Sequence, residues 1–400
     1  MQTLRNPPLP IRLMIKLRYG TNPHQEQAFI ELPNPSPLRV LNGAPGYINM
    51  LDALTSWQLA RELKEATGKP AAASYKHVSP AGAAIAKPID EAFKESQFLK
   101  HTDFSPVASA YVRARGGDRL CSFGDVLAVS DKVDVSLANF MKTEVSDLII
   151  APGYDPVALE ILKQKKKGEF VVLEIDYDFL PEGIESRDIF GIKISQTRNS
   201  RIITKADLSN VVSKKKEIPE DVIDTLLVAA ISLKYTQSNS ISLAYDGQIV
   251  GMGAGQQSRI HCTRLACEKA EKWFLQRHPK VRGLQFRDGI KKVDKTNLID
   301  QFLLWDTLSA TEERMMLEQF TVTPEAITRD ERLDWINAQK DICLGSDAFI
   351  PFRDNIDRAS RTNVQHIVET GGSLRSHLAL EAADEYGMTM IHTGIRSFLH

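Results

Sequence analysis

The sequence has few of the features that define several large classes of protein. Only four of its 400 residues are cysteines, and none forms a C-x-x-C pair, so reduced thiols in a cytoplasmic protein are expected. No apolar run approaches the roughly 20 residues of a membrane-spanning helix. The N-terminal segment carries Arg5, Arg12 and Lys16, but prolines interrupt it and it lacks an apolar centre. We therefore do not interpret it as a transit peptide.

The chain also lacks an excess of charge of either sign, with 50 basic and 51 acidic residues. This balance gives no overall field that would attract nucleic acid or an anionic membrane, so an anionic ligand must be held by a local arrangement of groups. The sequence contains no H-E-x-x-H motif, no P-loop and no G-x-S-x-G motif. Zinc chemistry is therefore disfavoured.

The patterns that are present alternate between helix and buried strand, which is typical of an α/β fold. Leucines at helical spacing predict a helix over residues 48–66, and the Gly68-Lys69-Pro70 segment ends it. Short apolar runs predict buried strands at 71–75, 148–151 and 170–175. A chain of this length usually forms two or three domains.

The second half of the chain repeats this alternation. Pro219 and the acids after it predict the start of a helix that runs to about Lys234. Asp246-Gly247 then predicts a hairpin between strands at 240–245 and 248–252. Residues 259–276 are expected to be helical.

A weak internal similarity links the two halves. Residues 120–134 and 342–357 share cysteine, glycine, serine and aspartate positions, and each block precedes an apolar strand that ends in glycine, at Gly153 and Gly394. Chance is one explanation. A duplication is the other, and it predicts two related α/β units with ligands at the strand ends between them.

Lys76 and His77 are the most informative candidates for catalysis. They follow the predicted strand at 71–75, in what we interpret as a loop turned by Pro80 and Gly82. Ligands of open α/β sheets gather at such strand ends. Histidine is a base near neutral pH, and an ammonium can stabilise charge that develops on a carbonyl oxygen. From composition alone, however, an ordinary surface pair is the stronger interpretation.

Three other segments combine polar and apolar groups that suit a ligand. Residues 251–259 join glycines to a helix start and Arg259, so they suggest either an anion-binding loop or a plain turn. Residues 235–240 suit an amide-bearing ligand or a capping turn. Residues 349–355 suit a flat heterocycle, or an aromatic core followed by a helix cap.

Together these motifs resemble the aminoimidazole carboxamide ribonucleotide (AICAR) formyltransferase domain, normally the C-terminal part of the bifunctional purine biosynthesis protein. The similarity runs in order from about Leu17 to His400 and is carried by residues 17–25, 41–49, 76–82, 234–240 and 253–264. It implies an α/β fold of two duplicated, zinc-free, cytidine-deaminase-like α/β/α units plus a small helical insertion. We place an N-terminal lead-in at 1–16, the two units at 17–200 and 201–400, and the insertion around 280–340.

The resemblance implies an enzyme that transfers the formyl group of 10-formyltetrahydrofolate to the 5-amino group of AICAR. The products are FAICAR and tetrahydrofolate, in the synthesis of inosine monophosphate (IMP). Only 16 residues precede Leu17, so we expect no IMP cyclohydrolase activity. The alternatives are a bifunctional enzyme with residual cyclohydrolase activity, formylation with formate and ATP, and a silent nucleotide-binding protein.

The resemblance also assigns roles to individual residues. His77 matches the general base, Lys76 the oxyanion-stabilising residue, and Asn239 the residue that orients the carboxamide and helps to hold His77. The residues that match AICAR-binding positions are Arg18, Tyr19, Asn49, Gly124, Asp147, Arg259 and Arg396. Those that match folate-binding positions are Ile260, Phe349, Asp354 and Ser373. The residue after Ser373 is Leu374, where the family has a small residue.

Two further expectations follow from the same resemblance. A structural monovalent cation, potassium, is expected near Thr236, Ser238, Ser240 and Asp347. The protein is expected to be a cytoplasmic homodimer whose active sites lie at the subunit interface.

Overall fold

The computed structural model of the chain describes residues 13–100 and 103–400, so residues 1–12 of the predicted lead-in lie outside the described part. Its main sheet has eleven strands: β3 (Leu38–Asn42), β4 (Ala71–Lys76), β5 (Ser79–Ile85), β6 (Asp125–Val129), β7 (Ser146–Ala151), β8 (Val171–Ile175), β11 (Ile241–Tyr245), β12 (Gln248–Gly253), β13 (Ile342–Ser346), β14 (Val364–Glu369) and β15 (Thr389–His392). Two antiparallel pairs lie outside it: β1 (Leu13–Lys16) with β2 (Phe29–Leu32), and β9 (Ile184–Ile189) with β10 (Ile192–Thr197).

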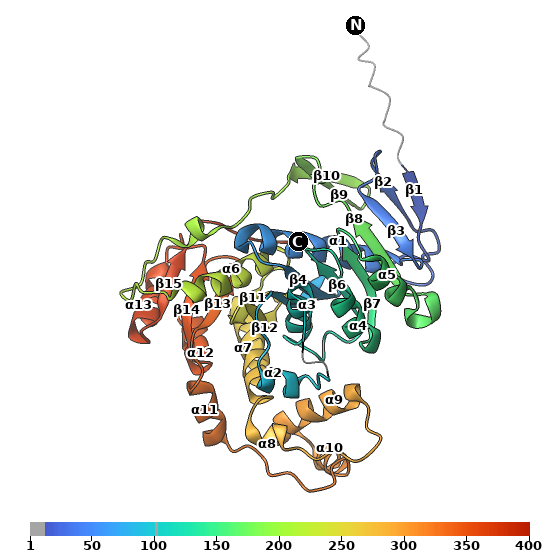
Figure 1. Cartoon of the computed structure of the whole chain (residues 1–400). Helices are drawn as coiled ribbons and strands as arrows, with labels where there is room; N and C mark the ends of the chain where they lie inside the picture. Colours follow the sequence, from blue (N-terminus) through green and yellow to red (C-terminus); the bar gives the residue numbers. More distant parts are fainter. Residues whose placement is uncertain (1–12, 101–102) are drawn as a thin grey trace.

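Helices cover both faces of the main sheet, as Figure 1 shows. They are α1 (Tyr47–Thr67), α2 (Glu91–Ser96), α3 (Pro106–Arg115), α4 (Val135–Thr143), α5 (Pro156–Lys163), α6 (Glu220–Lys234), α7 (Arg259–Leu275), α8 (Pro279–Arg282), α9 (Lys292–Leu303), α10 (Ala310–Leu317), α11 (Arg329–Asn337), α12 (Asp354–Arg361) and α13 (Ser376–Glu385), with 3-10 turns at Lys165–Gly168, Lys205–Leu208 and Trp305–Thr307. The prediction of a mixed α/β fold is confirmed. None of the helices in the described ranges combines the length and hydropathy of a membrane span.

The helix α1 shows how the sequence builds one layer. Leu59 and Leu63 are fully buried against the sheet, as their spacing predicts, and Gly68 ends the helix in a left-handed conformation. Leu51 and Leu54 belong to the same leucine pattern but are exposed. The spacing of the leucines therefore predicted the helix correctly, but only Leu59 and Leu63 mark its buried face.

The order of elements in the sheet repeats once. The series α1-β4-β5-α3-β6-α4-β7-α5-β8 is matched by α6-β11-β12-α7-β13-α12-β14-α13-β15. In each series the hairpin is antiparallel and the last three strands are parallel. The sheet order is β15-β14-β13-β11-β12-β5-β4-β6-β7-β8-β3. The topology is thus duplicated, while the boundary at residue 200 stays a prediction.

The segments that we paired in the sequence are not equivalent in this topology. Residues 120–124 precede β6, whereas residues 342–346 form β13 itself. The equivalent positions are Ser130-Asp131, directly after β6, and Ser346-Asp347, at the end of β13. The duplication is therefore present in the topology, but the residue pairing that suggested it was wrong.

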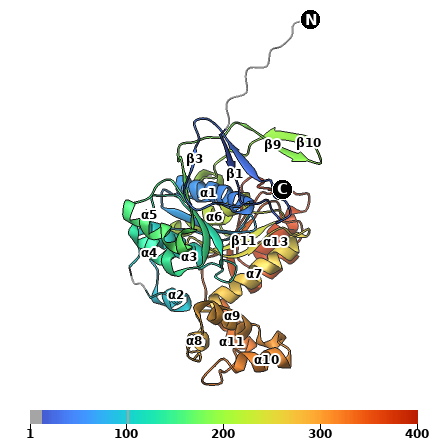
Figure 2. The same ribbon diagram turned by 90° about the vertical axis from the view of Figure 1, so that its right-hand side faces the viewer.

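The second half carries an additional group of helices. Helices α8 to α11 lie between α7 and β13 and form one end of the molecule, away from the main sheet (Figures 1 and 2). In the first half, the corresponding connection from α3 to β6 consists only of residues 116–124.

Glycines allow two helices to approach the centre of the sheet. A Cβ atom on Gly82 in β5 would overlap the carbonyl oxygen of Ala114 in α3, and one on Gly251 in β12 would overlap that of Ala266 in α7. Gly251 and Gly253 are thus strand residues that pack under α7, and only Gly255 of this motif lies in the loop that follows. The glycine motif serves packing first.

We predict that Gly251→Ala lowers the free energy of unfolding by about 3 kcal/mol, because the added methyl group forces α7 away from β12. Gly183→Ala is the control, since a Cβ atom at Gly183 meets no other atom within 4 Å. Urea unfolding followed by circular dichroism measures both changes. Equal stabilities of the two variants would contradict this account of the packing.

Candidate active site at one edge of the sheet

Lys76 and His77 lie at a tight turn rather than in the loop that we expected. Lys76 ends β4, and His77 and Val78 form the two-residue connection to β5. Pro80 and Gly82 lie inside β5, so the prediction of a loop was wrong. The strand accommodates Pro80 because the register shifts opposite Ser74 and Tyr75.

The backbone of this turn is left-handed at both central residues, with φ of 54° at His77 and 57° at Val78. Two-residue turns of this kind favour Asn-Gly or Asp-Gly. The related hairpin between β11 and β12 has that pair, Asp246-Gly247. A β-branched valine with positive φ is strained, and such strain concentrates at functional sites.

Asp52 of α1 supports the turn from below. Its carboxylate oxygen Oδ1 accepts a hydrogen bond from the backbone N–H of Val78 at 2.6 Å, and the residue is only 4% exposed. Burial raises the pKa of Asp52, and the Val78 N–H, His77 and Lys76 oppose that shift. Sequence reasoning did not identify Asp52. A carboxylate among the apolar residues of a predicted core helix was the available signal.

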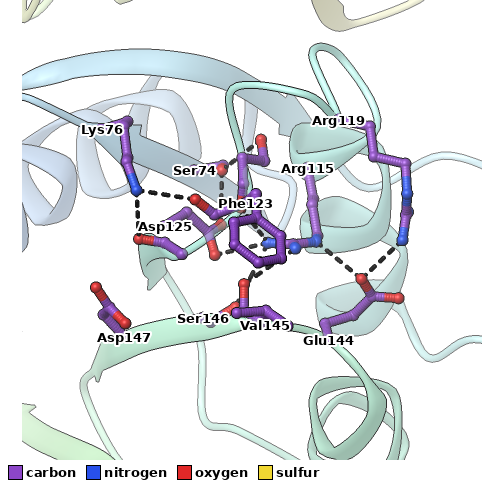
Figure 3. Close-up of polar contacts among 12 residues, drawn as sticks. Ser74, Lys76, Arg115, Arg119, Phe123, Asp125, Glu144, Val145, Ser146 and Asp147 are labelled. Atoms are coloured by element: carbon purple, nitrogen blue, oxygen red, sulfur yellow. Dashed lines mark hydrogen bonds and ion pairs between the residues drawn. The ribbon is translucent and has the colours of Figure 1, made fainter. Parts of the chain in front are cut away.

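The Lys76 ammonium is held by the loop before β6. Its Nζ donates to the carbonyl oxygens of Phe123, at 2.8 Å, and Gly124, at 3.2 Å. Gly124 has a φ of 71°, and a Cβ atom there would lie 3.1 Å from Lys76 Nζ and 3.9 Å from a carboxylate oxygen of Asp147. Lys76, Gly124 and Asp147 therefore lie together, as Figure 3 shows for the two side chains.

A buried ion-pair network around Arg115 holds the loop that contains Phe123 and Gly124 (Figure 3). Arg115 donates to the Ser122 carbonyl oxygen and to Asp125, each at 2.6 Å, and to Glu144 at 3.1 Å. Burial alone would raise the pKa of Glu144, but Arg119, Arg115 and Lys292 outweigh it and lower the pKa to about 2. A cavity of about 290 Å³ opens beside the network and reaches α9 of the helical insertion.

This network predicts a specific loss of stability in acid. The folded-state pKa of Glu144, about 2, lies below its ordinary value of 4.5. Its charged form therefore stabilises the fold above about pH 5, and that contribution is lost as the pH falls. Between about pH 5 and 3, the wild-type protein should lose on average about 1 kcal/mol of stability per pH unit more than Glu144→Gln.

Urea unfolding over this pH range measures the difference. Glu160→Gln is the control, because Glu160 lies on the exposed side of α5. Parallel pH dependences for the wild-type protein and Glu144→Gln would contradict the role of the network.

Three of the predicted AICAR-binding residues lie at the start of α1. The backbone N–H of Arg18 donates to Pro45, and that of Tyr47 donates to the Tyr19 carbonyl oxygen, both at 3.3 Å. Asn49 caps the helix by accepting from the Gly46 N–H at 3.0 Å. Asn49 lies one helical turn before Asp52, so this group borders the turn that carries Lys76 and His77. The side chains of Arg18 and Tyr19 are exposed.

A second group of predicted residues surrounds Arg259. Its guanidinium is buried and donates to the Asn239 side-chain oxygen at 2.8 Å, to Ser346 and to Asp347. The Asn239 amide nitrogen donates to the Gln256 carbonyl oxygen at 3.1 Å. Arg259 therefore positions Asn239, and its contact with the nucleotide stays a prediction. Within the described residues, no hydrogen bond joins Asn239 to His77.

The residues expected to hold a cation lie in the same region. Asp347 accepts from the N–H and hydroxyl groups of Ser240 at 2.9 and 3.0 Å, and its other oxygen faces Arg259. Thr236 donates to a carbonyl oxygen of α6, and Ser238 accepts from Leu399. Both Asp347 oxygens thus already have protein partners, so the cation stays a prediction and we derive no step from it. Within the described ranges, no three His, Cys, Asp or Glu side chains form a group that could hold a metal ion.

Three of the four predicted folate-binding residues, Phe349, Asp354 and Ser373, follow the carboxyl ends of β13 and β14. Phe349 is exposed, Asp354 begins α12, and Ser373 accepts from the Arg375 N–H at 3.1 Å. Ile260 is the second residue of α7. Leu374, where the family has a small residue, is 99% exposed.

The C-terminal segment joins this second group. The Ser397 N–H donates to the Asp347 carbonyl oxygen at 2.8 Å, and the Arg396 guanidinium lies over the Phe398 ring at 4.9 Å. The end of β4 and the ends of β12 and β13 lie at the same edge of the sheet. Within the described residues, no hydrogen bond or ion pair connects the Lys76–His77 group with the Arg259–Asn239 group.

A protein-family model described as "AICARFT/IMPCHase bienzyme" matches residues 5–269. The chain belongs to this family. The bifunctional purine biosynthesis protein PurH of Roseobacter denitrificans is 28% identical over 389 residues. That alignment covers 96% of this chain and 59% of the relative, so the chain spans less than two thirds of the bifunctional protein. The family expected from the motifs is confirmed.

Proposed function

We propose that this member of the AICARFT/IMPCHase family transfers the formyl group of 10-formyltetrahydrofolate to the 5-amino group of AICAR, in purine biosynthesis. The observation that carries the proposal is the turn at Lys76 and His77. There, an exposed histidine directly follows a lysine whose ammonium two carbonyl oxygens hold in position. A base and a fixed cation are what acyl transfer to a weak amine requires.

In the proposed reaction, the amine nitrogen of AICAR attacks the formyl carbon and a tetrahedral intermediate forms. His77 takes a proton from the amine, and the C–N10 bond of the folate breaks as N10 accepts a proton. A lysine ammonium has three N–H donors, and two of those of Lys76 are used by Phe123 and Gly124. The third remains for the developing oxyanion.

Asn239 is proposed to bind the carboxamide of AICAR. Its amide is fixed from both ends, by Arg259 and by the Gln256 carbonyl oxygen, so it can recognise the substrate without being reoriented. Asp147 beside Gly124 suits the ribose hydroxyl groups, and Arg18 and Arg396 suit the phosphate. The folate is proposed to lie against Ile260, Phe349, Asp354 and Ser373.

We predict that His77→Ala lowers kcat for formyl transfer at least about 100-fold, because the amine loses its base. His377→Ala is the control, since it removes an exposed imidazole from α13. The assay follows FAICAR formation with 10-formyltetrahydrofolate and, separately, with formate and ATP. Activity retained by His77→Ala would contradict the assignment of the base, and a preference for formate would favour the alternative donor.

The expected absence of IMP cyclohydrolase activity stays a prediction. Supplying FAICAR to the same protein and measuring IMP tests it.

We further propose that the protein forms a homodimer. The β9–β10 hairpin projects from the body of the molecule (Figures 1 and 2). Its tip residue Phe190 is 100% exposed, and Ile192 and Ile194 are also exposed. Apolar surfaces of this kind mark interaction sites, and a second copy is the occupant that the family resemblance implies.

The variant Phe190→Ser/Ile192→Ser should shift sedimentation equilibrium from dimer to monomer, because it removes apolar contact area from the proposed interface. Val322→Ser is the control, since Val322 is an exposed apolar residue of the helical insertion. A monomeric wild-type protein, or a double variant that still dimerises like the wild type, would contradict the proposal.

A further inference from the structure

The turn at His77 and Val78 needs support from outside the hairpin. In a two-residue hairpin turn, the flanking residues Lys76 and Ser79 pair with each other, and the N–H groups of the central residues have no partner in the strand ladder. Val78 is also β-branched and left-handed. The turn therefore combines a donor that must find an acceptor with a backbone conformation that valine disfavours.

Asp52 of α1 supplies the acceptor that the Val78 N–H needs, and so stabilises the left-handed conformation of Val78. Its carboxylate projects from α1 and accepts the Val78 N–H at 2.6 Å. Because Asp52 is 4% exposed, water competes little for this hydrogen bond. The bond joins a 21-residue helix to the turn. In the left-handed conformation at Val78, the backbone N–H of Val78 therefore has an acceptor.

The charges around Asp52 come from the groups proposed to carry the reaction. Lys76 and His77 lie close enough to stabilise its carboxylate, and Asp147 adds a second negative charge. Asp52 also lies one helical turn after Asn49, which caps the start of α1. The same helix therefore borders the proposed nucleotide site and holds the proposed base.

We infer that Asp52 is a positioning residue for the proposed formyl transfer, which holds the His77–Val78 turn in its strained conformation and so fixes the direction of the His77 side chain. This inference rests on the proposed function for its kinetic consequence. Its structural consequence, a protected Val78 amide, does not depend on that function.

The test compares Asp52→Ala, which removes the acceptor, with Asp52→Asn, which keeps a side-chain oxygen at the same position. We expect Asp52→Ala to lower kcat about 100-fold, because a small displacement of a reacting group costs that much. The KM values of both substrates should stay within about threefold, since Asp52 is buried under the turn and is proposed to act through His77. Asp52→Asn should retain kcat within about tenfold of the wild type.

A second-site variant separates positioning from general destabilisation. Val78→Gly removes the β-branched residue from the left-handed position, so it should restore at least about tenfold of the kcat lost in Asp52→Ala. Glu62→Gln is the matched control. Glu62 is also 4% exposed on α1, but it lies ten residues and about 15 Å along the helix from Asp52, where it binds Lys234 and Tyr235. It should lower stability and leave kcat within about threefold of the wild type.

Hydrogen exchange of the Val78 amide provides a readout that needs no activity. Protection should be lost in Asp52→Ala and kept in Asp52→Asn. Unchanged protection and kcat in Asp52→Ala would overturn the inference, as would an equal loss of kcat in Glu62→Gln. If the wild-type protein forms no FAICAR but the exchange pattern is as expected, the proposed function fails and the positioning role at the turn stands.

Discussion

The antiparallel contact between β5 and β12 is the constraint on which the rest of the molecule depends. It joins the two related series of elements into one sheet, with Gln248 opposite Ala84 at the junction. Because the two strands run in opposite directions, equivalent ends of the two halves lie at opposite edges. The β4–β5 turn of the first half therefore shares an edge with the ends of β12 and β13 from the second half. Glycines in both central strands let α3 and α7 pack close enough to support this junction.

The two edges show how a duplicated hairpin acquires different roles. The β11–β12 turn has Asp246-Gly247, the sequence that such a turn favours. The β4–β5 turn has His77-Val78 in the same left-handed conformation. The β4–β5 turn thus lacks the residues that favour its conformation, at the place where the chain exposes the proposed base. The carboxylate of Asp52 in α1 stabilises this conformation instead, by accepting the Val78 N–H. The loop at Phe123 and Gly124 is held in a comparable way, by the ion pairs of Arg115 with Asp125 and Glu144.

Much of this fold could be predicted from local sequence. The helix at 47–67, the strand at 71–76, the hairpin around Asp246-Gly247 and the helix at 259–275 agree with the predicted elements within one or two residues. The strand β5 was missed because Pro80 and Gly82 are typical of loops, and a register shift that depends on β4 accommodates them. Asp52 could have been noticed as a carboxylate in a core helix, but its partner Val78 lies 26 residues away in the chain and could not be predicted. The same holds for Arg115, which meets Asp125 and Glu144, 10 and 29 residues away, only in the folded sheet. The exposure of Leu51 and Leu54 could not be predicted either. Helical periodicity identifies an apolar face of a helix, but it does not show which other elements pack against that face.

The central claim is that AICAR binds with its amine at the Lys76–His77 turn. A crystal structure of the protein with AICAR and a folate analogue that cannot transfer its formyl group tests this most directly. The account predicts the 5-amino nitrogen within about 3 Å of a His77 ring nitrogen and the formyl-equivalent oxygen beside Lys76 Nζ. AICAR bound elsewhere on the protein, or bound with its amine directed away from His77, would contradict it.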